Sequence, residues 1–325
     1  MQRRQFLAGV PAVALGLGTT RISFAQKGSF PSQPVTLIVP FPPGGPTDAM
    51  IRLLGEGLRR EWNQPVIIDN KPGAGTIIGT HAVARAKPDG HTMGVVIAAH
   101  TANPSLRDEL PYDTFKDLSG VSMLATAPVG LYANNDFPAN NLKEFLEYAK
   151  ANRGKLSYGS VGAGSQAHIA GEAFSLRTDT DMIHIPYKGS APAQADLLGG
   201  HLPLLFDALP SGIELVKNGK MKLLAIGSAE RSPLVPDVMT FSEVVPGFIA
   251  EAFFALIVPS STPKETVEQL YEAVQKVVRS DEYRAWLNQR GFSASSLGKE
   301  DLDRFFVEDY QRWNEVIKKA NIKIS

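Results

Sequence analysis

The chain has 325 residues, of which 43% are hydrophobic and 20% charged, an ordinary balance for a soluble protein with one large core or two medium ones. Its 33 basic and 33 acidic residues cancel, so no overall positive field points to a nucleic-acid partner. The sequence contains no cysteine, which excludes a disulfide framework, a thiol nucleophile and a thiolate metal site.

Residues 1–25 are predicted to be an export signal. Arg3 and Arg4 precede an apolar stretch over 6–17, and small residues occupy positions 23 and 25, as signal peptidases require. Glycine and proline in this stretch argue against an ordinary N-terminal helix. The paired arginines resemble a twin-arginine signal, and a Sec signal is the alternative. We therefore expect a soluble, exported and periplasmic protein.

Strand-like and helix-like segments alternate through the rest of the chain, which predicts an α/β architecture with mainly parallel sheets. Strands are expected at 34–41 and 93–98. Between them, a helical pattern places four apolar residues on one face: Met50, Leu54, Leu58 and Trp62.

Two long apolar stretches separate an inner block of the chain from its two ends. The first, at about 121–134, is expected to be a strand kinked at Pro128. The second, at about 251–259, precedes a helical C-terminal part that starts with an expected capping box over 262–265. A chain that leaves one lobe, builds another and returns would have this pattern, with a ligand cleft at the hinge. The predicted lobes are 26–126 with 256–325, and 127–255.

Two glycine-rich turns connect an expected strand to an expected helix: "PFPPGGPTD" (40–48) and "YGSVGAGSQAH" (158–168). Backbone N–H groups and the helix dipole favour an anion at such a turn. The glycine spacing matches neither a dinucleotide loop nor a P-loop. Capture of a small carboxylate from both lobes is the favoured interpretation. The alternative is an exported hydrolase with Ser165 as nucleophile and His168 as base.

Five segments, taken in order, resemble the Bug or TctC-type extracytoplasmic solute receptors of tripartite tricarboxylate transporters: "PFPPGGPTD", "NKPGAGTIIGTHAVARAKPDGHT", "HTANPSL", "LSYGSVGAGSQAH" and "IPYKGSAPAQADLLGGHLPLLFDAL". The likeness runs from about residue 33 to the C-terminus. It implies a two-lobed type II periplasmic-binding-protein fold with two crossover strands as the hinge. The ligand would be a carboxylate that is bound largely by backbone amides.

The resemblance also implies partner proteins in the membrane. A large and a small integral membrane subunit would receive the ligand, and some members act instead with a sensor kinase. We expect a monomer with no enzymatic activity, no cofactor, no metal and no nucleic-acid partner. Citrate-like acids, dicarboxylates, acidic amino acids and aromatic acids all remain open as ligands.

Carried over by motif, the ligand site takes residues from the two glycine-rich turns and from three other places in the chain. The first-lobe turn supplies Phe41, Gly44, Gly45, Thr47 and Asp48, and the second-lobe turn supplies Ser160, Gly162, Gly164, Ser165 and His168. Thr101, Tyr187 and Asp207 would line the same cleft, and His100 is a candidate for ligand selectivity. Asp48, at a helix start, is expected to order its loop. His184, near two acids in "DTDMIH", is interpreted as part of a solvated turn.

Overall fold

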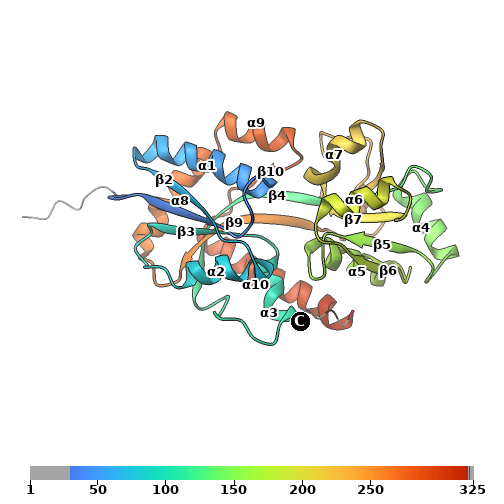
Figure 1. Cartoon of the computed structure of the whole chain (residues 1–325), viewed down its shortest axis with the longest axis horizontal. Helices are drawn as coiled ribbons and strands as arrows, with labels where there is room; N and C mark the ends of the chain where they lie inside the picture. The colour runs from blue at the N-terminus through green and yellow to red at the C-terminus, as the bar shows by residue number, and fades with distance from the viewer. Residues whose placement is uncertain (1–29, 321, 323–325) are drawn as a thin grey trace, which may run out of the picture.

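The structure, a computed structural model, describes residues 30–320 and residue 322; the predicted export signal lies outside these residues. Two α/β halves lie side by side and are joined by two long neighbouring strands, β4 (Leu118–Ala133) and β9 (Glu251–Pro259) (Figure 1). Within the described residues, no helix is both long enough and apolar enough to cross a membrane.

One sheet system runs through both halves in the order β2-β1-β3-β9-β4-β7-β5-β6. Strands β2, β1 and β3 are parallel in the first half, as are β7, β5 and β6 in the second, whereas β4 and β9 run antiparallel to their neighbours. The other strands are β1 (Val35–Val39), β2 (Val66–Asn70), β3 (Thr92–Val96), β5 (Ser157–Ser160), β6 (Ile183–Pro186), β7 (Leu204–Ala208), β8 (Lys222–Ile226) and β10 (Ser293–Ala294). Strands β8 and β10 both pair with β4.

Helices cover both faces of the sheet in each half (Figure 1). In the first half these are α1 (Pro46–Trp62), α8 (Lys264–Val278) and α9 (Asp281–Gln289) on one face, and α2 (Ile77–Ala84), α3 (Ala99–Leu106) and α10 (Lys299–Lys319) on the other. In the second half they are α4 (Leu142–Ala151) and α5 (Gln166–Thr178) on one face, and α6 (Ser190–Leu198) and α7 (Leu209–Lys217) on the other. Short 3₁₀ turns occur at Ala74–Thr76 and Phe241–Glu243.

The apolar helix faces expected from the sequence are buried. Met50, Leu54 and Leu58 are fully buried in the first core, and Trp62 packs at its edge. The cores of the two halves divide within β4, where Ala127 belongs to the first and Val129 to the second. The α/β class is therefore confirmed, while the lobe boundaries at 126/127 and 255/256 stay a prediction.

Two local expectations were wrong. Helix α8 begins after Pro263 without a side-chain cap, and the Thr262 hydroxyl donates to the carbonyl of Pro259 (2.7 Å) instead. Pro128 pairs in register with Glu251 of β9, and the irregularities of the β4 ladder lie elsewhere, within 120–125 and 131–132.

The C-terminal helix α10 contacts both halves of the molecule. Its Trp313 and Ile317 form one buried cluster with Leu106 of α3 and Ile169 of α5. Because α5 belongs to the second half, this cluster is an apolar contact between the halves in addition to the two connecting strands.

Candidate functional site

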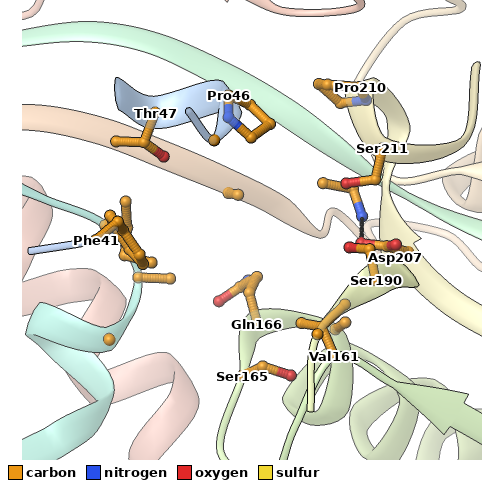
Figure 2. Close-up of a pocket in the computed structure, with 18 of the residues that line it drawn as sticks. Phe41, Pro46, Thr47, Val161, Ser165, Gln166, Ser190, Asp207, Pro210 and Ser211 are labelled. Atoms are coloured by element: carbon orange, nitrogen blue, oxygen red, sulfur yellow. Dashed lines mark hydrogen bonds between the residues drawn. The ribbon is translucent and has the colours of Figure 1, made fainter. Parts of the chain in front are cut away.

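A cavity of about 850 Å³ lies between the two halves. Its lining comes from both halves and includes the N-terminal ends of five helices, α1, α3, α5, α6 and α7. These ends contribute Gly45, Pro46 and Thr47; Ala98 and Ala99; Ser165, Gln166 and Ala167; Gly189, Ser190, Ala191 and Pro192; and Ala208, Pro210 and Ser211. Figure 2 shows side chains of the first half facing those of the second across this space.

The sheet topology explains why helix starts gather here. Strands β1, β3, β5, β6 and β7 are each followed directly by one of these helices. In an open α/β sheet, the carboxyl ends of the strands and the following helix starts form the binding crevice. The first N–H groups of each helix have no carbonyl partner within the helix and bear partial positive charge. The cavity therefore favours a negatively charged ligand.

Asp48 orders the first glycine-rich turn. Its buried carboxylate accepts hydrogen bonds from the Gly44 N–H (2.9 Å), the Arg52 Nε (2.8 Å) and the Asn70 Nδ2 (2.9 Å). The Asn70 amide also donates to the carbonyl of Phe41 (3.0 Å), which fixes the other end of the turn. The hydrogen bond from Arg52 is the main cause that lowers the pKa of Asp48 to about 2. Asp48 does not line the cavity, so its side chain acts on the loop.

The neighbouring glycines of this turn have different roles. Gly44 has φ +92°, a conformation that glycine adopts without strain, and its N–H is engaged by Asp48. Gly45 has φ −78°, and a Cβ placed on it would meet no protein atom within 4 Å. Gly45 lines the cavity together with Phe41 and Thr47, whereas Gly44 does not.

The second turn is fixed by serine hydroxyls. Ser165 is the N-cap of α5: its hydroxyl accepts from the His168 N–H (3.2 Å) and donates to the carbonyl of Gly162 (2.7 Å). Fully buried Ser160 donates to the same carbonyl (3.1 Å). Of this turn's predicted site residues, Ser165 alone lines the cavity; Ser160, Gly162 and Gly164 lie behind it.

His168 and His184 stack against each other with ring centroids 3.6 Å apart and an interplanar angle of 10°. His184 Nε2 lies 2.7 Å from the Ser160 hydroxyl, and His168 Nδ1 accepts from the Gly164 N–H (3.0 Å). Burial lowers the pKa of His168 to about 4 and that of His184 to about 3, so both rings are neutral at pH 7. The solvated-turn interpretation of His184 was therefore wrong, because β6 places this ring beside β5 and the start of α5.

The Ser165 and His168 side chains do not form a nucleophile–base pair. The Ser165 hydroxyl donates to a backbone carbonyl, and the His168 ring nitrogen Nδ1 accepts from a backbone N–H. A serine nucleophile needs a base that accepts its hydroxyl proton. Both residues instead hold the turn in place.

Three further predicted residues lie outside the cavity lining. His100 is buried against Phe306 of α10 (4.9 Å between ring centroids), and burial lowers its pKa to about 3. The Thr101 hydroxyl donates to Asp309 of α10 (2.6 Å). The Tyr187 hydroxyl donates to Asp196 of α6 (2.7 Å). Their side chains connect elements around the cavity, and their part in ligand binding stays a prediction.

Asp207, at the end of β7, does line the cavity and is 2% exposed. Its carboxylate accepts from the Ala208 N–H (2.7 Å) and from the Gln194 amide (3.4 Å). Burial raises its pKa to about 6, against the opposing effect of these hydrogen bonds. In Figure 2 it lies beside Ser190 and Ser211, on the opposite side of the space from Phe41 and Thr47.

Gln166 is a site residue that sequence reasoning missed. Its side chain points from the start of α5 into the space between the halves (Figure 2). Both polar atoms of its amide are buried and have no hydrogen-bond partner among the described residues. A buried amide without a partner costs stability, which a ligand with matching groups would recover. Ser190, at the start of α6, was missed as well, although "YKGS" repeats the pattern of a glycine and a hydroxyl after a strand.

Comparison with known proteins identifies the family and the fold. The family model for the tripartite tricarboxylate transporter family receptor, TctC, matches residues 50–322. The structure of periplasmic binding protein BugD is 33% identical, with a TM-score of 0.77, covering 90% of this chain and 99% of that one. The R. palustris protein Rpa4515 with adipate is 31% identical, with a TM-score of 0.81 and coverages of 90% and 99%.

MatC from Rhodopseudomonas palustris with bound malate is 32% identical, with a TM-score of 0.75, covering 89% of this chain and 100% of that one. The agreement over nearly the full length of each structure confirms the two-lobed periplasmic-binding-protein fold. The chain therefore belongs to the tripartite tricarboxylate transporter family receptors, the TctC or Bug-type solute-binding proteins that its sequence resembles.

Proposed function

We propose that this receptor captures a small organic carboxylate in the cavity between its lobes and delivers it to the membrane subunits of a tripartite tricarboxylate-type transporter. The observation that supports carboxylate capture most strongly is the gathering of five helix starts around one cavity whose lining includes no arginine. Backbone N–H groups can bind a carboxylate without a cationic side chain. Two relatives of the same fold have been solved with the carboxylates adipate and malate.

In this proposal the carboxylate binds at the starts of α1 and α5. At the start of α7, the Ala208 N–H already donates to Asp207. The first turns of α1 and α5 lie in opposite lobes and face the same cavity through Thr47 and Ala167. The unpartnered amide of Gln166 lies at the same place and supplies a side-chain donor. Ligand binding would thus connect the lobes and favour the closed form.

The proposal also includes that the receptor resides in the periplasm and delivers its ligand to a large and a small membrane subunit. The family description and the periplasmic relatives support both. Cells that keep the membrane subunits but lack this receptor should lose high-affinity uptake of the ligand. Uptake that is unchanged would contradict the transport role and leave ligand capture as a separate property.

A binding screen with the purified receptor tests ligand capture. Organic acids are compared with their own uncharged amides by thermal shift and calorimetry. At least one acid should bind, and its amide should bind at least about 100-fold more weakly, because helix starts favour the anion. An amide that binds as well as its acid would contradict the proposal. Turnover of esters that is lost in Ser165→Ala would instead favour the hydrolase.

A matched pair of variants tests the placement of the carboxylate. Gln166→Leu should weaken acid binding by about tenfold or more, since a hydrogen bond to a charged group contributes about 1.5–3 kcal/mol. Gln311→Leu makes the same change at an exposed position of α10 and should leave affinity unchanged. Equal affinities in the two variants would exclude Gln166 from the binding site.

A further inference from the structure

The cavity walls are mainly apolar. Apart from alanines, its apolar lining consists of three phenylalanines, three larger aliphatic residues and five prolines: Phe41, Phe254 and Phe292; Ile97, Val129 and Val161; and Pro42, Pro43, Pro46, Pro192 and Pro210. Its volume of about 850 Å³ lies within the range of small-molecule binding sites. A ligand with an apolar body would remove this surface from water on binding, at about 25 cal/mol per Å².

Charged groups around the cavity are few, and the buried one among them is an acid. Among the lining residues, Asp207 and Lys188 are the two that bear a charged side chain, and no arginine or histidine joins them. Lys188 is exposed, so water and salt screen its charge. Asp207 is buried, where a like charge is repelled more strongly than in water.

The positions of these groups give the cavity two different ends. In the proposed binding mode the anion lies at Gln166 and the starts of α1 and α5, whereas Asp207 lies on the wall of the second lobe beside Ser190 and Ser211 (Figure 2). Hydrogen bonds from the Ala208 N–H and Gln194 hold the Asp207 carboxylate in place. A ligand that extends from the first end to this wall would meet a carboxylate there.

We infer that the ligand is a monocarboxylate with an apolar body of medium chain length or the size of an aromatic ring, and that Asp207 disfavours a second carboxylate at the far end. The inference rests on the proposed function, whose carboxylate site it extends. The end of the ligand that lies near Asp207 can be uncharged, or it can carry a hydroxyl that donates to Asp207.

Hexanoate and adipate make a suitable test, because both have six carbons and differ in the second carboxylate. 3-Phenylpropionate adds a ring to a single carboxylate. Calorimetry with the wild-type receptor at pH 7.5 should give affinities for hexanoate and 3-phenylpropionate at least about tenfold higher than for adipate, a difference of about 1.4 kcal/mol. Asp207→Asn should reduce this preference by about tenfold. Glu214→Gln, which removes an exposed charge on α7 outside the cavity, should not.

The outcomes separate the inference from the proposed function. Adipate or citrate binding more tightly than both monocarboxylates would overturn the inference and leave carboxylate capture intact. No binding of any of these acids would overturn both. A wild-type preference for monocarboxylates that Asp207→Asn leaves unchanged would support the ligand class and overturn the role of Asp207.

Discussion

The hydrogen bonds of Asp48 allow the stability of the first ligand loop to be tested as a function of pH. We expect Asp48→Asn to lower the free energy of unfolding by about 1.5 kcal/mol at pH 7. The pKa of Asp48 falls from its ordinary 3.8 to about 2, and each pKa unit corresponds to about 1.4 kcal/mol. Half-exposed Arg52 is screened by water, which places the effect nearer the lower end of a range of about 1–2.5 kcal/mol.

The direction of the pH effect follows from the lowered pKa. A carboxylate with a depressed pKa stabilises the folded state fully above its unfolded pKa of 3.8, and this contribution disappears as the pH falls towards about 2. Urea unfolding of the wild type and Asp48→Asn should therefore differ most at pH 5–7 and converge below pH 4. Tryptophan fluorescence and circular dichroism report the transition.

A second variant serves as the control: it removes an acidic side chain that does not hold the first ligand loop. Asp69→Asn removes a partly exposed carboxylate that pairs with Lys71 (2.9 Å), and it should change the free energy of unfolding by less than about 0.5 kcal/mol. An equal loss in the two variants at pH 7 would refute the reasoning. So would a loss in Asp48→Asn that stays constant between pH 7 and pH 3.

Four other substitutions have expected outcomes. Gly44→Ala should lower the melting temperature through about 1–2 kcal/mol of strain at φ +92°, whereas Gly45→Ala should leave it unchanged and weaken acid binding about tenfold, measured by calorimetry. Ser165→Ala removes the N-cap of α5 and should cost about 1 kcal/mol in thermal unfolding; no loss would contradict the cap. Thr101→Val takes a hydrogen bond from buried Asp309 and should cost about 1–3 kcal/mol in urea unfolding; a neutral change would contradict this.

The structural features that could be predicted from the sequence are those set by residues close together along the chain. The periodic spacing of Met50, Leu54 and Leu58 predicts a buried helix face because their distances along a helix follow from its geometry. The two glycine-rich turns could be placed at helix starts for the same reason. The order of strands and helices also indicated the α/β class.

The distribution of hydrogen bonds could not be predicted in this way. Gly44 and Gly45 look alike in sequence, yet Asp48 engages the N–H of the first and leaves the second facing the cavity. Thr101 contacts Asp309, 208 positions later, so its orientation depends on where α10 packs. The space around Gln166 likewise depends on two lobes that meet only in the folded chain.

The pairing between β4 and β9 restricts how the two lobes can move. Hydrogen-bonded pairing joins these strands from Leu118 opposite Pro259 to Pro128 opposite Glu251, and both cross between the two cores. Neither crossing can bend independently without breaking this ladder, so any opening of the cleft would bend both strands together as a two-stranded ribbon. The stiffness of that ribbon, together with the apolar cluster between α10 and α5, would limit how far the lobes can separate.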